Sequence, residues 1–524
     1  MANDGHESLS SKGRLKTVAA TAVVLLLLLV GFWPWFETTG PPMDEGMVLI
    51  YPELVAHGKI PYRDFETFYG PANPYFLAGA YQFFGTHLFT ERGVGLLYRV
   101  FVITAVWGIA RRWGTLAGAG GMLIAGALLI CTELMASAWI PGLGCALASL
   151  WITSSASRAG PRYFFGGCLG GLALLFRPDL GPAVMLSSLP LLWGAAWRNR
   201  IYYAAGFIVA LLPLAIVTLA AGIGNVWDNL FYYPVIASNP GRRLPLSSAD
   251  PHVLHLLFFH LIASLIIAAS ALLELRKDRT STRGLVLLST AILALVLTPQ
   301  AIQRLDFGHL FFAAVVSLPL LPIAMVNLLS RTRSAARNNL TVAAAVLATV
   351  VLIGIVAPVL AMMVRAAYVF GLTSQQTAIF VQNNGRIFPY GSREAADTAA
   401  RLFQKLQTVS KPGERLFVGP ADLRRTNYCD TYIYHLFPQL RPASYFLEMN
   451  PFSANRPHSR LAADVSSADW LVLDRLMDQW NEPNRSAEFG DDAPNLVVLK
   501  KFELVGDFGP YGLFKRKSVS ETPD

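Results

Sequence analysis

The chain has 524 residues, of which 53% are hydrophobic and only 15% are charged, whereas a soluble globular protein carries about 25% charged residues. Several apolar runs approach or exceed the roughly 18 residues that span a bilayer, so a soluble protein is excluded and an all-α polytopic membrane protein is predicted. The net charge of +9 does not indicate nucleic-acid binding, because the cations lie in short loops between apolar runs, as in membrane proteins.

The first apolar run, residues 17–36, follows a tail of residues 1–16 that contains Lys12, Arg14 and Lys16. The run is long for the core of a signal peptide, and no small-residue cleavage site follows it. A Trp-Pro-Trp sequence at 33–35 closes it, which is typical of a helix end at a membrane interface. We therefore expect a retained membrane anchor.

The loop after this anchor, residues 37–91, is the most informative stretch of the chain. It opens with two adjacent acids, Asp44 and Glu45, and then contains helix-like stretches at 47–57 and 73–84. Two interfacial helices are more than a tether needs, although a solvated connector with aromatic anchors is the simpler alternative. A run rich in aromatic and charged residues lies between the two stretches. Its candidate substrate-binding residues are Arg63, Asp64 and Tyr69.

Hydropathy predicts eleven membrane-spanning helices. They cover residues 17–36, 93–110, 115–132, 135–155, 162–177, 180–197, 201–222, 253–273, 284–300, 308–329 and 341–364. The third and fourth could instead form a re-entrant pair, because Pro141-Gly142 and the glycines at 118–121 weaken them.

The loop charges orient these spans. With the N-terminus in the cytoplasm, every inner loop carries two or more cations, and most loop acids fall on the outer side. This alternation follows the positive-inside rule. It places the loop 37–91 and everything after about residue 365 outside the membrane.

Two further polar links fall on the outer side. Arg177 and Asp179 lie where the fifth span meets the sixth, and a link at 299–309 joins the ninth span to the tenth. The simple interpretation is a pair of local salt bridges that cap helix ends, but a shared face with Asp44 favours function. The candidate residues of the second link are Gln303, Arg304, Asp306 and His309.

The outer loop 222–251 adds Arg242 and Arg243 as candidate substrate-binding residues. His252 and His255 follow at a helical i, i+3 spacing that can bind metal, although an interfacial pair is the commoner reading. Asp44, Glu45 and His309 could also converge on a divalent cation or never meet, so the sequence leaves metal dependence open. The four cysteines show no disulfide or metal framework.

The polar region 365–524 is predicted to be a small α/β domain outside the membrane, after a transmembrane domain of residues 17–364. It contains a helical pattern at 398–409 and short buried strands at 415–418 and 470–473. Residues 502–505 and 512–515 are expected to form a hairpin.

Transfer of a sugar from a lipid-linked phosphate needs a base for the acceptor hydroxyl, which suits a carboxylate. It also needs fixed cations for the departing phosphate, and the planar fork of arginine suits phosphate. Asp44 opposite Arg177 and Arg304 would meet both needs, and no glycine-rich nucleotide loop is present.

In its acid pair, long first outer loop, span number and outer C-terminal domain, the chain resembles the GT-C fold. It is most similar to glycosyltransferases that use polyprenyl-phosphate sugars, such as protein O-mannosyltransferases and the lipid A aminoarabinose transferase. The resemblance implies that Asp44 is the catalytic base, with Glu45 beside it and Asp179 as a second acid. It implies that Arg177 and Arg304 hold the donor phosphate, supported by His309 and Asp306. A Trp-Trp-Asp motif is missing, which argues against transfer of a whole glycan.

The sequence thus predicts a glycosyltransferase of the cell inner membrane that moves one sugar, by inversion, from a polyprenyl-phosphate donor to an extracytoplasmic acceptor. A transporter or lipid flippase is one alternative, but its ionisable groups would lie near the bilayer midplane. A polymerase or ligase of surface polysaccharide is the other, and it gives the acid pair no obvious purpose.

Overall fold

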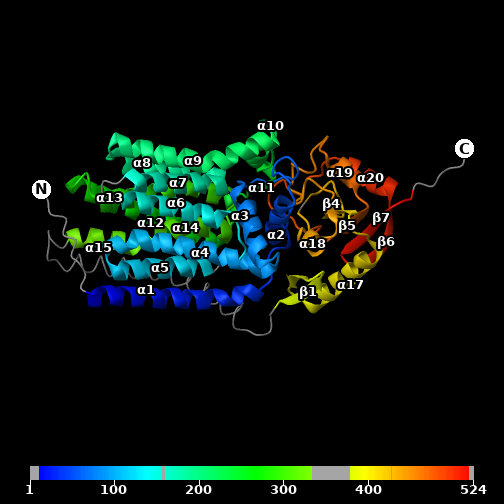
Figure 1. Cartoon of the computed structure of the whole chain (residues 1–524), viewed down its shortest axis with the longest axis horizontal. Helices are drawn as coiled ribbons and strands as arrows, with labels where there is room; N and C mark the ends of the chain where they lie inside the picture. The colour runs from blue at the N-terminus through cyan, green and yellow to red at the C-terminus, as the bar shows by residue number, and fades with distance from the viewer. Residues whose placement is uncertain (1–10, 131, 156–159, 333–377, 427, 519–524) are drawn as a thin grey trace, which may run out of the picture.

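The computed structural model describes residues 11–130, 132–155, 160–332, 378–426 and 428–518. A long bundle of helices carries a mixed α/β domain at one end, and α1 begins at the opposite end (Figure 1). The predicted span 341–364, the domain boundary near 365 and Cys131 lie outside the described residues.

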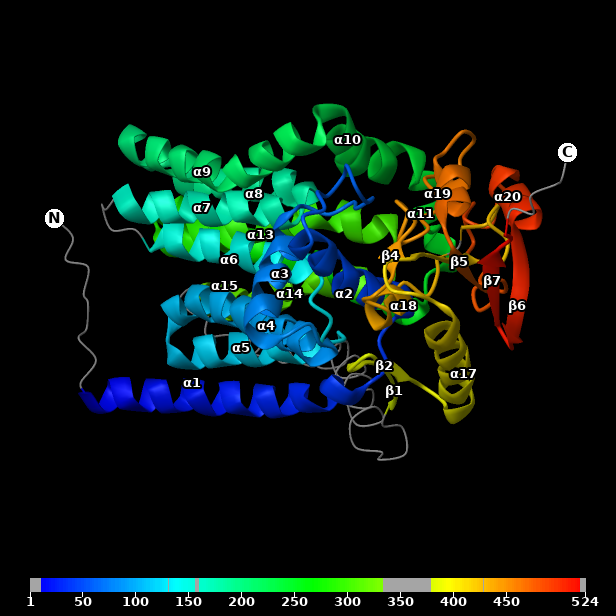
Figure 2. The same cartoon turned by 45° about the vertical axis from the view of Figure 1, so that its right-hand side comes forward.

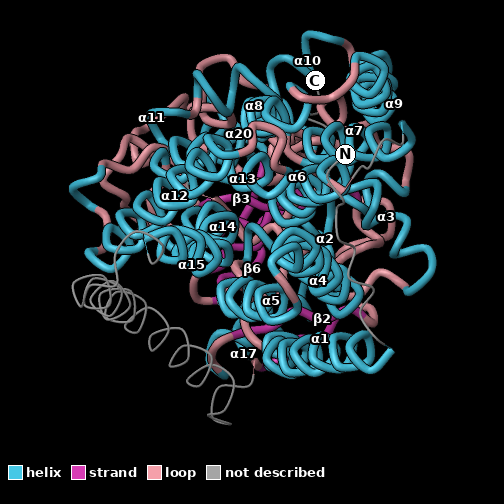
Figure 3. Tube along the Cα trace, turned by 90° about the vertical axis from the view of Figure 1, so that its left-hand side faces the viewer, coloured by secondary structure: helices cyan, strands magenta, loops and turns pink. Residues whose placement is uncertain are grey.

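Each apolar run predicted as a helix between residues 17 and 329 is helical in the bundle. Its helices are α1 (Ser11–Phe32), α4 (Leu88–Ala110), α5 (Thr115–Ile130), α6 (Trp139–Ser154), α7 (Gly160–Phe176), α8 (Gly181–Trp193), α9 (Trp197–Ala221), α12 (Pro251–Lys277), α13 (Thr282–Gln303), α14 (Phe307–Ser317) and α15 (Leu321–Thr332). Viewed along the bundle, α1 and α9 lie at opposite edges (Figure 3).

Five helical stretches of the described residues are long and apolar enough to cross a membrane: Leu88–Trp113, Trp197–Ala221, Pro251–Lys277, Thr282–Gln303 and Phe307–Leu329. The pair Thr21–Glu37 and Pro42–Ala56 would add a sixth if it is counted as one broken span, but it is bent by 96°. The remaining helices are shorter, so the count of eleven spans stays a prediction.

Glycines let α7 and α9 pack backbone against backbone. A Cβ at Gly167 would lie 1.9 Å from the Tyr203 carbonyl oxygen, and a Cβ at Gly206 would lie 2.0 Å from that of Phe164. Small residues at such contacts allow the close helix approach that is common in membrane bundles.

Three loops that the positive-inside rule assigns to the cytoplasm meet at one end of the bundle. Arg112 donates to the hydroxyls of Ser154 and Ser155 at 2.6 and 2.7 Å. Arg283 donates to the Arg112 carbonyl oxygen at 2.9 Å. Three predicted inner loops therefore share a surface.

The two helices expected in the loop 37–91 are present as α2 (Pro42–Ala56) and α3 (Ala72–Phe84). A proline at the first position of α2 suits a helix start. Asp44 and Glu45 in its first turn interact favourably with the helix dipole. Figure 2 shows α2 and α18 (Tyr432–Leu436) at the junction between the bundle and the α/β domain.

Gly46 lets α2 contact α18 directly. A Cβ at Gly46 would lie 2.2 Å from the Tyr432 backbone nitrogen, and the backbone has little freedom to move away. We expect Gly46→Ala to destabilise this contact by about 1–3 kcal/mol, as overpacking does, and to lower the melting temperature of the purified protein. Gly79→Ala is the matched control, since nothing lies within 4 Å of a Cβ there; equal melting temperatures for the two variants would contradict the contact.

The α/β domain is built on a five-stranded sheet of order β4-β3-β5-β7-β6. Its strands are β3 (Arg415–Pro420), β4 (Arg441–Pro442), β5 (Trp470–Asp474), β6 (Phe502–Phe508) and β7 (Tyr511–Arg516). β3 pairs in parallel with β4 and β5, and β7 pairs antiparallel with β5 and β6. The strands and the hairpin predicted from the sequence are confirmed.

A separate hairpin, β1 (Ile379–Asn383) and β2 (Arg386–Tyr390), leads into α17 (Arg393–Val409), which confirms the helix predicted at 398–409. The domain also contains α19 (Leu461–Ser467) and α20 (Ala493–Lys501). α17 is strongly amphipathic: Leu402, Phe403 and Leu406 are buried in the core, while its other face is exposed.

Candidate functional site

Asp44 lies at the junction of the bundle and the α/β domain, and its carboxylate has no partner among the described residues. It is half-buried, and no hydrogen bond or ion pair holds its side chain within the part of the chain that the structure describes. Burial raises the pKa of Asp44 above its ordinary value, while the positive charges of Arg304 and Arg242, together with the His309 ring, oppose that rise. A carboxylate with a raised pKa accepts a proton more readily.

Arg304, at the end of α13, is tied to the α/β domain. Its guanidinium pairs with both oxygens of Glu482, with Nη1 at 3.0 Å from Oε2, and its Nε lies 3.7 Å from Asp306 Oδ2. Burial lowers the pKa of Arg304, but the hydrogen bonds to Glu482 outweigh this and raise it. Arg304 is therefore a permanent cation beside Asp44.

Asp306 has the capping role that was the simple interpretation of this link. Its carboxylate accepts the backbone N–H of His309 at 2.9 Å at the start of α14, and it contacts the His309 ring Nδ1 at 2.8 Å. Both side chains nevertheless act electrostatically on Asp44. The cap is thus part of the same charged cluster.

Arg177 and Asp179 also pair locally, with Nη2 2.6 Å from Oδ2. The guanidinium lies over the Tyr69 ring at 5.0 Å, and Gln300 of α13 donates to Asp179. Burial acts to raise the pKa of Asp179, but Arg177 and Arg242 lower it below its ordinary value. Asp179 therefore stays ionised and paired, and is a weaker base than Asp44.

Arg242 is the cation that links these groups. It ends α11 (Asn239–Arg242), which follows α10 (Ile223–Trp227) and a π-helix at Asp228–Ala237. Its guanidinium lies over the Phe68 ring at 5.5 Å and makes no ion pair with any described residue. Its charge lowers the pKa of both Asp44 and Asp179.

The end of α13 fixes the segment that carries Arg242. The Gln303 side chain donates to Asn239 Oδ1 at 3.3 Å, and its carbonyl oxygen accepts from the Leu244 N–H at 3.0 Å. The neighbouring Arg243 is exposed.

Arg63 and Asp64 are not brought into this cluster. They pair with each other at 2.9 Å, with the Arg63 side chain 46% exposed, and Arg63 lies 3.5 Å from the Ala220 carbonyl oxygen at the end of α9. Neither is among the main charges that affect the pKa of Asp44. They hold the loop against α9.

Glu45 is turned away from its neighbour and buried. Arg92 of α4 donates to its two oxygens at 2.7 and 2.9 Å, and the two side chains are 1% and 2% exposed. Arg92 also donates to the carbonyl oxygens of Phe36 and Thr38 at 2.7 and 2.9 Å. The pair thus fixes the start of α2, and Glu45 is not positioned to touch an acceptor.

The α/β domain contributes residues outside the candidate site predicted above. Glu448 is buried and accepts from the Tyr51 hydroxyl at 2.6 Å and from Asn450 at 3.0 Å. Burial raises its pKa, and its charge acts on Tyr69 and Tyr51. Tyr428, whose φ of 69° is unusual for a non-glycine residue, lies close enough to Arg304 and Asp44 to be affected by their charges. No local pattern marks Glu448 as part of the site, because its partner Tyr51 lies 397 positions away.

Glu66, in the same loop as Asp44, is buried against the α/β domain. It accepts from the hydroxyl of Ser453 and from Asn450 at 3.3 Å. Burial raises the pKa of Glu66 from 4.5 to about 8, so the folded protein favours the protonated form. The associated stability is fully present below pH 4.5 and is lost as the pH rises through about 8.

We therefore expect the melting temperature of the wild-type protein to fall between pH 5 and pH 9 by more than that of Glu66→Gln, which stays neutral. The difference should be on the order of 5 °C. Glu503→Gln, at an exposed position, should keep the wild-type pH dependence. Parallel curves for wild type and Glu66→Gln would show that Glu66 is not the titrating group.

Among the described residues, no group of three or more His, Cys, Asp or Glu side chains is arranged to hold a metal ion. The His252 and His255 rings lie 6.5 Å apart at the start of α12.

The fold of this chain is similar to that of proteins of known structure. It aligns with the crystal structure of ArnT from Cupriavidus metallidurans in the apo state at a TM-score of 0.53 and 15% identity, over 95% of this chain and 98% of that one. It aligns with the same protein bound to undecaprenyl phosphate at a TM-score of 0.51 and 16% identity, over 98% and 100%. No family model and no curated protein matches the sequence. The chain has the GT-C fold, as its resemblance implied.

Proposed function

We propose that the protein is a membrane glycosyltransferase that moves one sugar from a polyprenyl-phosphate donor to an extracytoplasmic acceptor, with inversion. The observation that supports it most is the Asp44 carboxylate, which no described residue pairs with, within a cluster of cations at the junction of bundle and domain. Undecaprenyl phosphate is bound in one of the similar structures, and it is the kind of lipid phosphate that the proposed reaction would release. Eleven spans, a cytoplasmic N-terminus and location in the inner membrane are part of the proposal.

In the proposed reaction, an acceptor hydroxyl attacks the anomeric carbon of the donor sugar as Asp44 takes its proton. The bond between that carbon and the phosphate oxygen breaks, and polyprenyl phosphate leaves with the bonding electrons. Arg242 stabilises the charge that develops on the phosphate, because a preorganised cation acts most strongly where charge appears. Solvent then removes the proton from Asp44.

Arg242 takes the phosphate-binding role ahead of Arg177 and Arg304 because it is free to do so. Arg177 is paired with Asp179, and Arg304 with Glu482, so each would have to exchange a carboxylate for the phosphate. In this proposal they shape the field around Arg242, and Asp179 supports Arg177.

The proposal is tested with purified protein in lipid nanodiscs and polyprenyl-phosphate donors that carry different labelled sugars. Wild-type protein should release the lipid phosphate from at least one donor when a membrane extract supplies acceptors. Arg242→Gln should lower kcat/KM by about 100-fold, which is typical for loss of one group that stabilises transition-state charge. Arg198→Gln, an exposed cation at the start of α9, is the charge-matched control.

Undecaprenyl phosphate should also raise the melting temperature of wild type and of Arg198→Gln, and raise that of Arg242→Gln much less. If the lipid phosphate stabilises all three proteins equally, Arg242 does not bind it. If no donor is consumed by wild type while substrate accumulates in vesicles, the protein is a transporter.

A further inference from the structure

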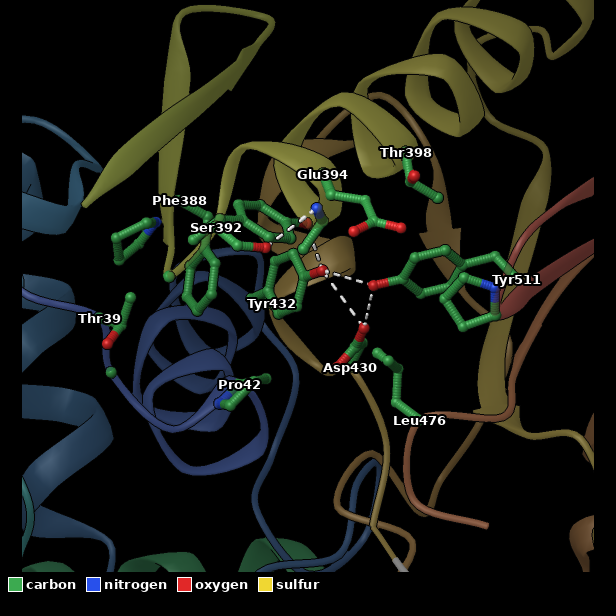
Figure 4. A pocket seen from close by; sticks show the side chains of 16 residues that line it. Thr39, Pro42, Phe388, Ser392, Glu394, Thr398, Asp430, Tyr432, Leu476 and Tyr511 are labelled. Carbon is green, nitrogen blue, oxygen red and sulfur yellow. Dashed lines mark hydrogen bonds between the residues drawn. The ribbon is translucent and has the colours of Figure 1, made fainter. Parts of the chain in front are cut away.

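A cavity beside the first turn of α2 is not used by the proposed reaction. It has a volume of about 380 Å³, which is within the range of small-molecule sites. β2, the first turn of α17 and the segment before β7 line it together with Thr39, Gly40 and Pro42. Figure 4 shows the cavity with its lining side chains.

One wall of the cavity is polar, and hydrogen bonds fix its side chains. Asp430 is 1% exposed, and its Oδ2 accepts from the Tyr511 hydroxyl at 2.7 Å and from the Tyr432 hydroxyl at 3.3 Å. The Tyr390 hydroxyl bonds to that of Tyr432. Within the described residues, Asp430 Oδ1 accepts no hydrogen bond, so this network keeps an open acceptor.

Aromatic rings and further oxygens complete the lining. The rings of Phe388 and Tyr432 stack at 3.9 Å between centroids. Glu394 on α17 faces the tyrosine hydroxyls (Figure 4), and its exposed carboxylate has no partner among the described residues. Rings beside hydroxyl and carboxylate oxygens suit a ligand with apolar C–H faces and hydroxyl edges, which is the chemistry of a sugar ring.

The charged residues that line the cavity favour some of these ligands over others. Two carboxylates, Asp430 and Glu394, line the cavity, and its lining contains no Lys, Arg or His from the described residues. Burial raises the pKa of Asp430, while the hydrogen bonds from the tyrosine hydroxyls oppose the rise. A phosphate or a carboxylated sugar would be repelled here, whereas a neutral or amino-bearing sugar would not.

The cavity also borders the segment that carries Asp44. Gly40 lines it, and a Cβ there would lie 1.8 Å from Glu45 Oε2, so its wall backs onto the Glu45–Arg92 pair. Pro42, the first residue of α2, also lines it, two positions before Asp44.

We infer that this cavity is a separate sugar-binding site, which holds a neutral or amino-bearing sugar unit of the acceptor beside the start of α2. That the unit belongs to an acceptor rests on the proposed function, but sugar binding itself requires no transfer.

The experiment measures binding of three trisaccharides to the full-length protein in nanodiscs: maltotriose, tri-N-acetylchitotriose and the glucosamine trimer. Trigalacturonate is the anionic comparison. Ala395→Trp fills the cavity from an exposed position in the first turn of α17, and Ala400→Trp places the same side chain on the same helix outside the cavity. Saturation-transfer NMR on each protein gives the dissociation constants.

At least one of the three uncharged or amino trisaccharides should bind, and trigalacturonate should not. Ala395→Trp should weaken that binding by about tenfold or more, as loss of one or two good contacts does. Ala400→Trp and Asp44→Asn should leave it within about twofold. Failure of all three trisaccharides to bind, equal binding by the two tryptophan variants, or equal binding of trigalacturonate would each overturn the site.

The two proposals fail separately. Sugar binding that depends on residue 395 in a protein without transferase activity would overturn the transferase and, with it, the claim that the bound unit belongs to an acceptor. Transfer without such binding would overturn the site alone.

Discussion

Replacing Asp44 by asparagine is expected to reduce sugar transfer by about 10²–10⁴-fold, the usual contribution of a general base. The amide has nearly the same size but cannot accept the proton of the acceptor hydroxyl. Since no described residue bonds to the Asp44 side chain, the substitution breaks no contact. The melting temperature and the binding of undecaprenyl phosphate should therefore stay close to those of wild type.

The exposed Glu37, in the same loop, provides the control, because Glu37→Gln also changes an acid to an amide. The measurement is kcat with a labelled polyprenyl-phosphate donor, on protein that elutes as a single species. Unchanged kcat in Asp44→Asn would remove Asp44 from the base role and leave Asp179 as the next candidate.

The pH profile gives the same assignment an independent test. A general base acts only when deprotonated, so kcat should fall as the pH decreases through the pKa of Asp44. That pKa is raised by burial, so the fall should occur at higher pH than an exposed aspartate would give. In Asp44→Asn the residual rate should lose this limb.

Much of the bundle could be predicted from the sequence because its signals are local. Apolar runs set the helices from α1 to α15, and paired cations such as Arg111 and Arg112 mark the ends that meet at one surface. The same is true of the domain, where β5 is buried throughout and β3 is buried after its exposed first residue, Arg415. Each of these patterns is complete within a few residues.

The candidate site was only partly predictable. Asp44, Arg242, Arg304, Asp306 and His309 do lie together, as their shared face suggested. The opposite behaviour of Asp44 and Glu45 could not be read from the sequence, because it depends on Arg92, 47 positions away. Glu482 and Glu448 belong to a domain whose docking no local pattern encodes. Pairing decides function here: a cation held by a carboxylate is less available to a substrate than a free one.

The second large effect is expected at the pair that holds α2 in place. Glu45 and Arg92 are almost fully buried, and Arg92 also binds two backbone carbonyl oxygens. Removal of one member leaves a buried charge without a counter-charge, which costs about 3–5 kcal/mol. Arg92→Met and Glu45→Gln should each lower the melting temperature strongly. They should also reduce transfer, because Asp44 is carried by the turn that the pair anchors.

A double-mutant cycle separates the pair from its surroundings. If the two side chains interact mainly with each other, the double variant Arg92→Met/Glu45→Leu should cost clearly less than the sum of Arg92→Met alone and Glu45→Leu alone. Arg111→Met, at the exposed far end of α4, should change stability by less than about 1 kcal/mol. Additive losses in the cycle would mean that Arg92 acts through the carbonyl oxygens of Phe36 and Thr38, and that Glu45 contributes no anchor of its own.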